Sequence, residues 1–289
     1  MNPLSALRSW LRTGFWMILF ILCHLSCQAG TVAVSVPIPP LKWLAEQVGE
    51  GLVSCQVLVR GGQEPHTFAP TPKQMAVLFR SRLYFSLGMP FDRQLAARIR
   101  QAAPAIRVID LTAGLKKLSL DGNQETGVDP HVWLSPPNLA GMAEVMASAL
   151  AETDPAHRDD YLANLEKTRS LLAGLHRRIG SLLAPCSGRS IYVFHPAFGY
   201  FTHTYGLRQQ PVEQDGKPPA PGRLATLVAA MKKNKVQVLF VQPQFDRKTI
   251  QTLARAIKGT VVPLDPLAED VAGNLLAMAE TIHAALCAK

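Results

Sequence analysis

The sequence predicts an α/β protein made of two lobes with parallel-type sheets, joined by a single long linker helix. Short runs of β-branched residues alternate with longer helical patterns in both halves of the chain. Because parallel strands need crossover connections, this alternation favours mostly parallel sheets with helices on both faces. Between the two halves, one helical pattern continues for longer than any other.

The first half of the chain alternates strands rich in Val, Ile and Leu with helices that begin near proline. The predicted strands are residues 31–36, 53–59, 83–87 and 106–111. The predicted helices are residues 40–48, 72–80, 91–102 and 137–152. A loop with turn residues, 113–129, separates the last of these strands from the last helix.

The long helix begins after Asp154-Pro155, a pair typical of helix starts. Its apolar residues recur at steps of mostly three, four or seven, which is the period of one helix face. They are Leu162, Leu165, Leu172, Leu175, Ile179 and Leu182. The pattern predicts one helix of roughly 28 residues, about 40 Å long at 1.5 Å per residue.

The second half returns to the alternation of strands and helices. The predicted strands are residues 190–194, 207–211, 236–241 and 260–264. The predicted helices are residues 197–205, 223–233, 246–258 and 271–287, with a loop at 213–222. No sequence repeat relates the two halves, although strands in each half end in a polar loop.

The start of the chain has the organisation of a secretory signal. Arg8 and Arg12 precede the apolar run 15–22, which ends near Cys27-Gln28-Ala29. We expect cleavage after Ala29, since the run is short of the ~20 residues that an uncleaved anchor needs. We expect no lipid anchor, because His24 stands where lipoprotein signals usually carry Leu. The mature protein is therefore predicted to be periplasmic or otherwise extracytoplasmic.

These features divide the chain into four predicted segments. They are a signal peptide at 1–29, a first lobe at 30–153, the linker helix at 154–184 and a second lobe at 185–289. With 48% hydrophobic and 18% charged residues, the chain has the composition of a globular protein rather than a disordered one. We expect a monomer.

The charge distribution indicates which classes of partner to expect, and the cysteines indicate which disulfide can form. The formal net charge is +9, but the Lys and Arg residues are scattered, with no cluster longer than a pair, as in Lys116-Lys117. We interpret them as a solvated surface rather than an interface for nucleic acid or an anionic membrane. Of the three cysteines outside the leader, Cys186 and Cys287 are the pair that we favour for a disulfide. Three buried thiols without a bridge are the alternative.

Three histidines share a setting at the end of a strand or the start of a loop. His66 follows Glu64-Pro65, His131 follows Asp129-Pro130, and His195 precedes Pro196. Because ligands gather at the carboxyl ends of strands in open α/β sheets, the three side chains could converge in one cleft, with Asp265 after another strand. Three imidazoles and one carboxylate suit a tetrahedral divalent ion, Zn²⁺ above all, with Mn²⁺ or Fe²⁺ as alternatives. The competing interpretation is three histidines that cap loops by hydrogen bonds.

Five segments resemble the metal-binding solute receptors of ABC importers, the ZnuA and TroA type. They are GGQEPHTFAP at 61–70, DPHVWLSP at 129–136, FHPAFGYF at 194–201, VQPQF at 241–245 and VPLDPLAED at 262–270. The similarity covers nearly the whole mature chain in order. It implies a clam-like pair of α/β lobes linked by one rigid helix, with a metal site between them.

Carried over residue by residue, the resemblance places the metal ligands at His66, His131, His195 and Asp265. It implies a receptor that captures Zn²⁺ as its transported ligand and delivers it to a membrane permease driven by a cytoplasmic ATPase. Histidine at the third position is typical of zinc receptors in this family, whereas many manganese receptors have Glu there. Manganese or iron as the transported ion is the alternative.

Two departures from the family's pattern stand out. The loop 115–128 has no histidine, so we expect no auxiliary capture site there. Gln242 replaces the Glu that relatives usually have in an EPQF-like segment, and the sequence does not show what this change does.

A zinc-dependent hydrolase is the main rival function, with Glu64 as its general base. Four protein ligands would leave no open coordination position, and no HExxH or GxSxG motif is found. We therefore expect no enzyme. An adhesin that uses the same fold to hold a host ligand is a third hypothesis, although nothing in the sequence requires it.

The carboxylates beside the ligands and the remaining histidines have simpler interpretations. Glu64 and Asp129 could orient imidazoles, although a solvated carboxylate is the simpler expectation. His157 and His176 are expected to be solvated. His203 is expected to pack against other side chains or to contact a metal-ligating residue without binding the metal itself. His283 is expected at the surface of the last helix.

Overall fold

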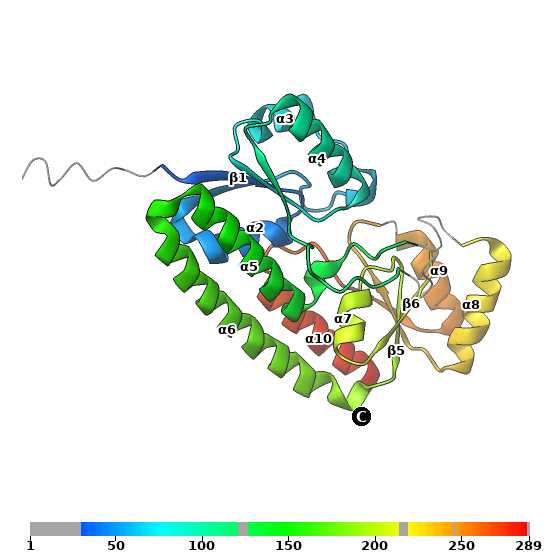
Figure 1. The fold of residues 1–289 in the computed structure, drawn as a ribbon. Coiled ribbons are helices and arrows are strands. Elements are labelled where there is room, and N and C mark those ends of the chain that lie inside the picture. Colours follow the sequence, from blue (N-terminus) through cyan, green and yellow to red (C-terminus); the bar gives the residue numbers. More distant parts are fainter. Residues whose placement is uncertain (1–29, 121–126, 214–218, 246, 288–289) are drawn as a thin grey trace, which may run out of the picture. The chain divides into compact units, whose positions relative to one another are not determined.

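Two four-stranded parallel sheets form the framework of the protein (Figure 1). The computed structural model describes residues 30–120, 127–213, 219–245 and 247–287. The predicted signal peptide, 1–29, lies outside these residues, as does the 121–126 part of the loop before His131. One compact unit of the chain begins at Val32.

The first sheet has the strand order β2-β1-β3-β4. Its strands are β1 (Val32–Val36), β2 (Val53–Val57), β3 (Leu83–Ser86) and β4 (Arg107–Asp110). Its helices are α2 (Pro39–Gly49), α3 (Pro72–Leu78), α4 (Pro90–Ala102) and α5 (Pro136–Thr153). All four residues of β3 are buried, as expected for a central parallel strand covered on both faces.

The second sheet repeats this topology with the strand order β6-β5-β7-β8. Its strands are β5 (Ser190–Val193), β6 (Arg208–Pro211), β7 (Val238–Val241) and β8 (Thr260–Pro263). Its helices are α7 (Gly199–Thr204), α8 (Pro221–Lys233), α9 (Arg247–Ile257) and α10 (Val271–Cys287). In both sheets the strand order reverses between the first and third strands, which is where α/β sheets place ligands.

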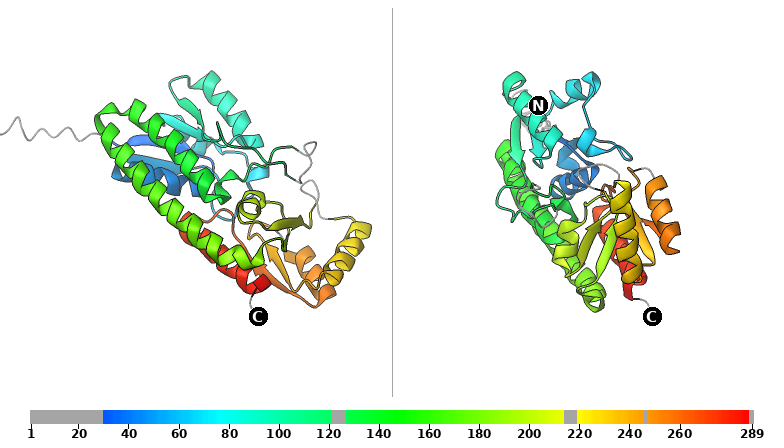
Figure 2. Two further views of the ribbon diagram at one scale, coloured as in Figure 1. Left: turned by 60° about the horizontal axis from the view of Figure 1, so that its bottom comes forward. Right: turned by 90° about the vertical axis from the view of Figure 1, so that its right-hand side faces the viewer.

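A single long helix, α6 (Arg158–Leu183), runs between the two lobes, with one 3₁₀ turn at each end. Its 26 residues confirm the predicted linker helix. α6 packs against α2 and α5 of the first lobe and against α10, which lies beside it in both orientations (Figures 1 and 2). The long helix thus contacts both halves of the molecule.

The predicted apolar face of the long helix needs one correction. Leu162 is 39% exposed, and its neighbour Tyr161 is buried instead. Adjacent residues of a helix point about 100° apart, so only one of the two faces the core. The Tyr161 hydroxyl donates to Asp154 Oδ2 at 2.9 Å, which satisfies its polar group at the edge of the core.

Cys186 and Cys287 form a disulfide, as the sequence analysis favoured. It joins the 3₁₀ turn after α6 to the end of α10. One hydrophobic cluster continues through the first lobe, α6, α10 and part of the second sheet. The predicted lobe boundaries at residues 153 and 185 therefore remain predictions. No helix in the described part of the chain has the length and apolar character needed to span a bilayer.

Candidate metal centre

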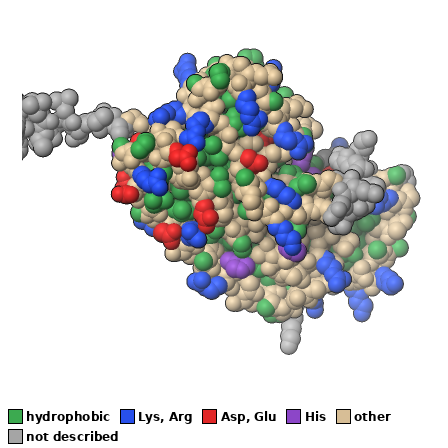
Figure 3. Space-filling view, viewed as in Figure 1, with side chains coloured by type: hydrophobic (Ala, Val, Ile, Leu, Met, Phe, Trp, Pro, Cys, Tyr) green, Lys and Arg blue, Asp and Glu red, His purple; other side chains and the backbone are tan. Residues whose placement is uncertain are grey.

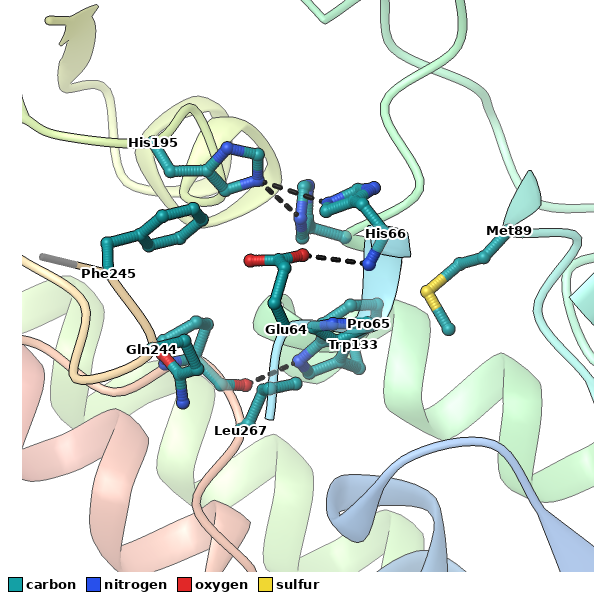
Figure 4. A pocket seen from close by; sticks show the side chains of 11 residues that line it. Glu64, Pro65, His66, Met89, Trp133, His195, Gln244, Phe245 and Leu267 are labelled. Atoms are coloured by element: carbon teal, nitrogen blue, oxygen red, sulfur yellow. Dashed lines mark hydrogen bonds between the residues drawn. The ribbon is translucent and has the colours of Figure 1, made fainter. Parts of the chain in front are cut away.

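Three of the predicted ligands lie together. His66 sits in the 3₁₀ turn Pro65–Thr67, His131 directly precedes the 3₁₀ turn Val132–Leu134, and His195 follows β5 by two residues. The Nε2 atom of His195 lies 3.2 Å from that of His66 and 3.3 Å from that of His131. One ring nitrogen from each of the three lies within 4.8 Å of the others (Figure 4).

The segment around His66 is shaped by its own sequence. Gly62 has a φ of 81°, a left-handed conformation that glycine adopts at low cost. Pro65 occupies the first position of the following 3₁₀ turn. Glu64 caps this turn, since its Oε1 accepts a hydrogen bond from the backbone N–H of His66 at 2.8 Å. Glu64 therefore bonds the main chain rather than the imidazole.

His131 is held by a fully buried carboxylate. Asp129 Oδ1 accepts hydrogen bonds from the backbone N–H of His131 at 2.9 Å and from its ring Nδ1 at 2.7 Å. Asp129 has no exposed surface, so the expectation of a solvated carboxylate is wrong here. The reason is packing between the lobes: a Cβ atom on Gly199 of the second lobe would come within 2.3 Å of Asp129 Oδ2.

His195 is held at its ring and at its backbone. Glu213 Oε1 accepts a hydrogen bond from His195 Nδ1 at 2.6 Å. The Gln242 side chain accepts from the His195 N–H at 3.2 Å and donates to the His195 carbonyl at 2.6 Å. Gln242 follows β7 and His195 follows β5, so this pair of bonds spans the point where the strand order reverses. The Gln242 amide therefore fixes the main chain at His195.

Sequence reasoning missed Glu213. It is 4% exposed and lies two residues beyond β6, at the carboxyl edge of the sheet. This position after the end of a strand is the signal that could have identified Glu213, because the histidines and Asp265 were proposed from the same kind of position. The sequence pattern instead places Glu213 at the start of the predicted loop 213–222.

The two carboxylates determine which nitrogen faces the centre. When Nδ1 carries the proton and donates to a carboxylate, the Nε2 atom of a neutral imidazole has a free lone pair. We infer that His131 and His195 point two such lone pairs at each other across 3.3 Å. Two acceptors do not form a hydrogen bond, so this arrangement suits a cation between them.

The distances fit a metal ion of known size. Zn–N bonds of about 2.0–2.1 Å at tetrahedral angles place the ligand nitrogens about 3.3–3.4 Å apart. The Nε2 separations of 3.2 and 3.3 Å agree with that spacing. Burial lowers the pKa of His66, and the neighbouring His195 lowers it further. A lowered pKa keeps this imidazole neutral and able to bind a cation.

Asp265, the fourth predicted ligand, lies outside this group of three. It follows β8 by two residues, and its Oδ1 accepts hydrogen bonds from the Leu267 N–H at 2.9 Å and from Gln244 Nε2 at 2.8 Å. Gln244 lines the same pocket as the three histidines. The Asp265 carboxylate is therefore one side chain removed from the cluster.

Apolar side chains form the remaining walls of the pocket (Figure 4). They include Met89, Trp133, Phe245 and Leu267. The Phe245 ring stacks on His195, with ring centroids 5.0 Å apart. Trp133 Nε1 donates to the Pro266 carbonyl at 2.7 Å, which links the first lobe to the loop after β8. Such walls lower the polarity around the histidines, which strengthens electrostatic interactions within the site.

The other histidines of the described chain lie outside the cluster. His157 and His176 are half-buried rather than solvated, since His157 Nδ1 pairs with Asp154 at 2.8 Å and His176 lies 3.4 Å from the Tyr205 hydroxyl. His203 is exposed, so the expectation that it packs or supports a ligand is wrong. Its position on the short helix α7 turns it toward solvent.

A family model described as zinc-uptake complex component A, periplasmic (ZnuA), matches residues 34–286. The chain belongs to the ZnuA family. The zinc uptake protein ZnuA of Yersinia pestis is 26% identical over 270 residues, which cover 83% of this chain and 85% of that protein. The iron-binding protein YfeA of Yersinia pestis is 26% identical over 240 residues, covering 78% and 74%. A crystal structure of ZnuA matches with a TM-score of 0.84 at 35% identity, covering 88% of this chain and 99% of that one.

Membership of the ZnuA family confirms the resemblance found in the sequence. The chain is a metal-binding solute receptor of the ZnuA type, and the proteins that it matches are metal-binding and transport proteins rather than enzymes. The rival hydrolase is thereby excluded, and the backbone cap that Glu64 provides gives that residue a structural role in place of the general base.

Proposed function

We propose that this protein is an extracytoplasmic receptor that captures Zn²⁺ and delivers it to an ABC importer permease driven by a cytoplasmic ATPase. The observation that carries the proposal is the convergence of three histidine ring nitrogens within 4.8 Å, with His195 Nε2 at the spacing of tetrahedral zinc ligands from the other two. The zinc-uptake relatives support the same ion. Export by a signal peptide cleaved after Ala29, and a monomeric state, belong to the same proposal.

We propose His66, His131, His195 and Asp265 as the four ligands. Asp265 Oδ1 accepts from Gln244 Nε2 and from the Leu267 N–H, and binding of the ion would require this carboxylate to turn toward the histidines. Behind the histidines, Asp129 and Glu213 place two carboxylates that favour a doubly charged cation. Three imidazoles with one carboxylate favour zinc over manganese, which prefers oxygen ligands.

Iron is the alternative ion, and the iron-binding relative YfeA gives it specific support. A competition experiment separates the ions. The exported protein, stripped of metal, is dialysed against equal concentrations of Zn²⁺, Mn²⁺ and Fe²⁺, and its metal content is measured by elemental analysis. We expect about one zinc per chain, as one four-ligand site holds.

Three variants test the ligand set. Replacing all three histidines by Ala should abolish retention, and Asp265→Asn should weaken it. The matched control is His203→Ala, an exposed histidine outside the cluster, which should retain zinc like the native chain. Retained manganese or iron would overturn the choice of ion, and full zinc retention in the triple variant would overturn the site.

Delivery needs a separate measurement. The zinc-loaded protein should stimulate the ATPase activity of its importer reconstituted in vesicles, and the metal-free protein should not. Equal stimulation in both states would contradict a role in delivering zinc.

A further inference from the structure

The net charge of the chain is concentrated in one segment, although no run of basic residues exceeds a pair. Residues 216–264 contain nine Lys and Arg residues and a single acidic residue, Asp246, so they hold a net charge of +8 out of +9. Arg8 and Arg12 of the leader account for a further +2, and the rest of the chain has a net charge of −1. The positive charge is thus a property of α8, α9 and their connections.

Five of these cationic residues gather at one end of the second lobe, which we call the basic pole. They are Lys232, Lys233, Lys235, Arg255 and Lys258, and all five are exposed. The helices α8 and α9 pack side by side, and both end where β7 and β8 begin (Figure 2). Val238 pairs with Thr260, so the connections that contain Lys235 and Lys258 lie next to each other.

Five cations elsewhere in the described chain form ion pairs, although others, such as Lys73 and Arg98, do not. Lys42, Arg107, Lys167, Arg169 and Arg178 each form an ion pair with a glutamate. Within the described part of the chain, no carboxylate pairs with a cation of the basic pole. On the face shown in Figure 3, acidic side chains lie toward the first lobe and α6, whereas the charged side chains at the lower right, over the second lobe, are Lys and Arg.

Two of the lysines also occupy unfavourable backbone conformations. Lys235 has a φ of 52° and Lys258 a φ of 59°, in the left-handed region where helices usually end on glycine. The Val236 N–H donates to the Met231 carbonyl, and the Gly259 N–H to the Ala254 carbonyl, so both helices end with the same turn. Lysine is thus found twice at a position where glycine would avoid strain. The helix dipole favours cations near the last turn but does not require them at these two strained positions.

We propose that the basic pole binds the anionic phospholipid surface of a membrane. Protein interfaces are depleted of Lys and have apolar anchors at their centre. The exposed large hydrophobic residues in the described chain lie elsewhere: Val77, Phe79, Val128, Leu162 and Leu171. A lysine-rich surface without apolar anchors fits lipid headgroups, which attract basic residues by charge alone.

The basic pole lies at the opposite edge of the sheet from the candidate metal centre. His195 and Asp265 follow the carboxyl ends of β5 and β8, whereas Lys235 and Lys258 precede the amino ends of β7 and β8. Membrane contact would therefore leave the metal pocket open. The inference goes beyond metal capture, and its test does not depend on the metal.

Vesicle co-sedimentation tests the proposal with the exported, leaderless protein. We expect binding to vesicles that contain phosphatidylglycerol, release by high salt, and no binding to phosphatidylcholine alone. The variant Lys235→Gly with Lys258→Gly should bind roughly 30-fold more weakly, since each basic group near an anionic surface contributes about fivefold. Its thermal stability should not fall, because glycine suits both backbone positions.

The matched control removes two charges from exposed cations of the first lobe, Lys73→Gln with Arg98→Gln. It should bind vesicles like the native protein. Equal weakening in both double variants would show an effect of net charge alone and overturn the assignment to the basic pole. If the native protein does not bind vesicles that contain phosphatidylglycerol, the lipid proposal is wrong. This is the result expected if the basic pole binds an acidic protein instead. Zinc retention by each variant reports on the metal site separately.

Discussion

The two lobes share one strand order but hold their histidines in different ways. In the second lobe, Glu213 bonds the His195 ring and Gln242 bonds its backbone on both sides. In the first lobe, His66 is half-buried, and among the described residues no carboxylate bonds its Nδ1. His131 is intermediate, with one buried carboxylate at ring and backbone. The second lobe thus presents a fixed ligand, and the first presents one that can adjust as the ion arrives.

The largest expected effect separates His195 from His66. His195→Ala should lower zinc affinity by more than about 100-fold, because outer partners alone contribute roughly 10–100-fold. It should also lower the thermal stability of the metal-free protein, since it leaves Glu213 buried without its partner. His66→Ala should also lose zinc but keep its stability, because Glu64 still caps the backbone. Competition titration and thermal unfolding measure the two effects, and equal stability losses would contradict the comparison.

The disulfide offers a second contrast between the lobes. It closes 101 residues of sequence between α6 and the end of α10, whereas Cys55 of the first lobe is free. Replacing Cys186 and Cys287 together by Ser should lower the free energy of unfolding by about 2–4 kcal/mol. Hydrogen exchange should show the loss of protection in β5 to β8 rather than in β1 to β4. Uniform loss across both sheets would show that the disulfide secures the whole molecule.

The buried carboxylates should have the next largest effect. Glu213→Gln and Asp129→Asn keep the size of each side chain but remove its charge, and each should lower zinc affinity roughly 10–100-fold. Glu213→Asp keeps the charge and should restore part of the loss. In the cobalt-substituted protein, the visible spectrum should change in both amide variants if the imidazoles reorient. Unchanged affinity in Glu213→Gln would show that the ring is held by packing alone.

Sequence patterns predicted the fold closely because its signals are local. The period of the apolar residues predicted the long helix, and short apolar or β-branched runs between turns predicted most strands of the described chain, although β6 (Arg208–Pro211) has no β-branched residue. Leu162 was misplaced because it and Tyr161 are adjacent in sequence, and burial of a tyrosine depends on a distant partner such as Asp154.

The site was predicted less completely, because its supporting residues are determined by packing. Their setting at the end of a strand or the start of a loop marked the three histidines, and the family resemblance joined them into one set. The position of Glu213 after a strand could have marked it as a candidate, but nothing near it in the sequence indicates that it bonds His195. The burial of Asp129 likewise depends on Gly199, 70 residues away and in the other lobe. Contacts of this kind follow from how strands and lobes are arranged in space.

The smallest expected effect is the contribution of His66, the ligand that can adjust, to the pH dependence of stability. Burial, with the nearby His195, lowers the pKa of His66 below its ordinary value of 6.5. The unfolded chain therefore binds a proton at this residue more readily than the folded chain, so stability falls as the pH drops below about 6.5 and is retained above it. From about pH 7.5 to about pH 5.5, a range that spans the ordinary imidazole pKa, the metal-free native protein should lose more thermal stability than His66→Gln. An equal loss in both proteins would mean that His66 is free to take up its proton in the folded state, and the contrast between an adjustable first lobe and a fixed second lobe would then rest on hydrogen bonding alone.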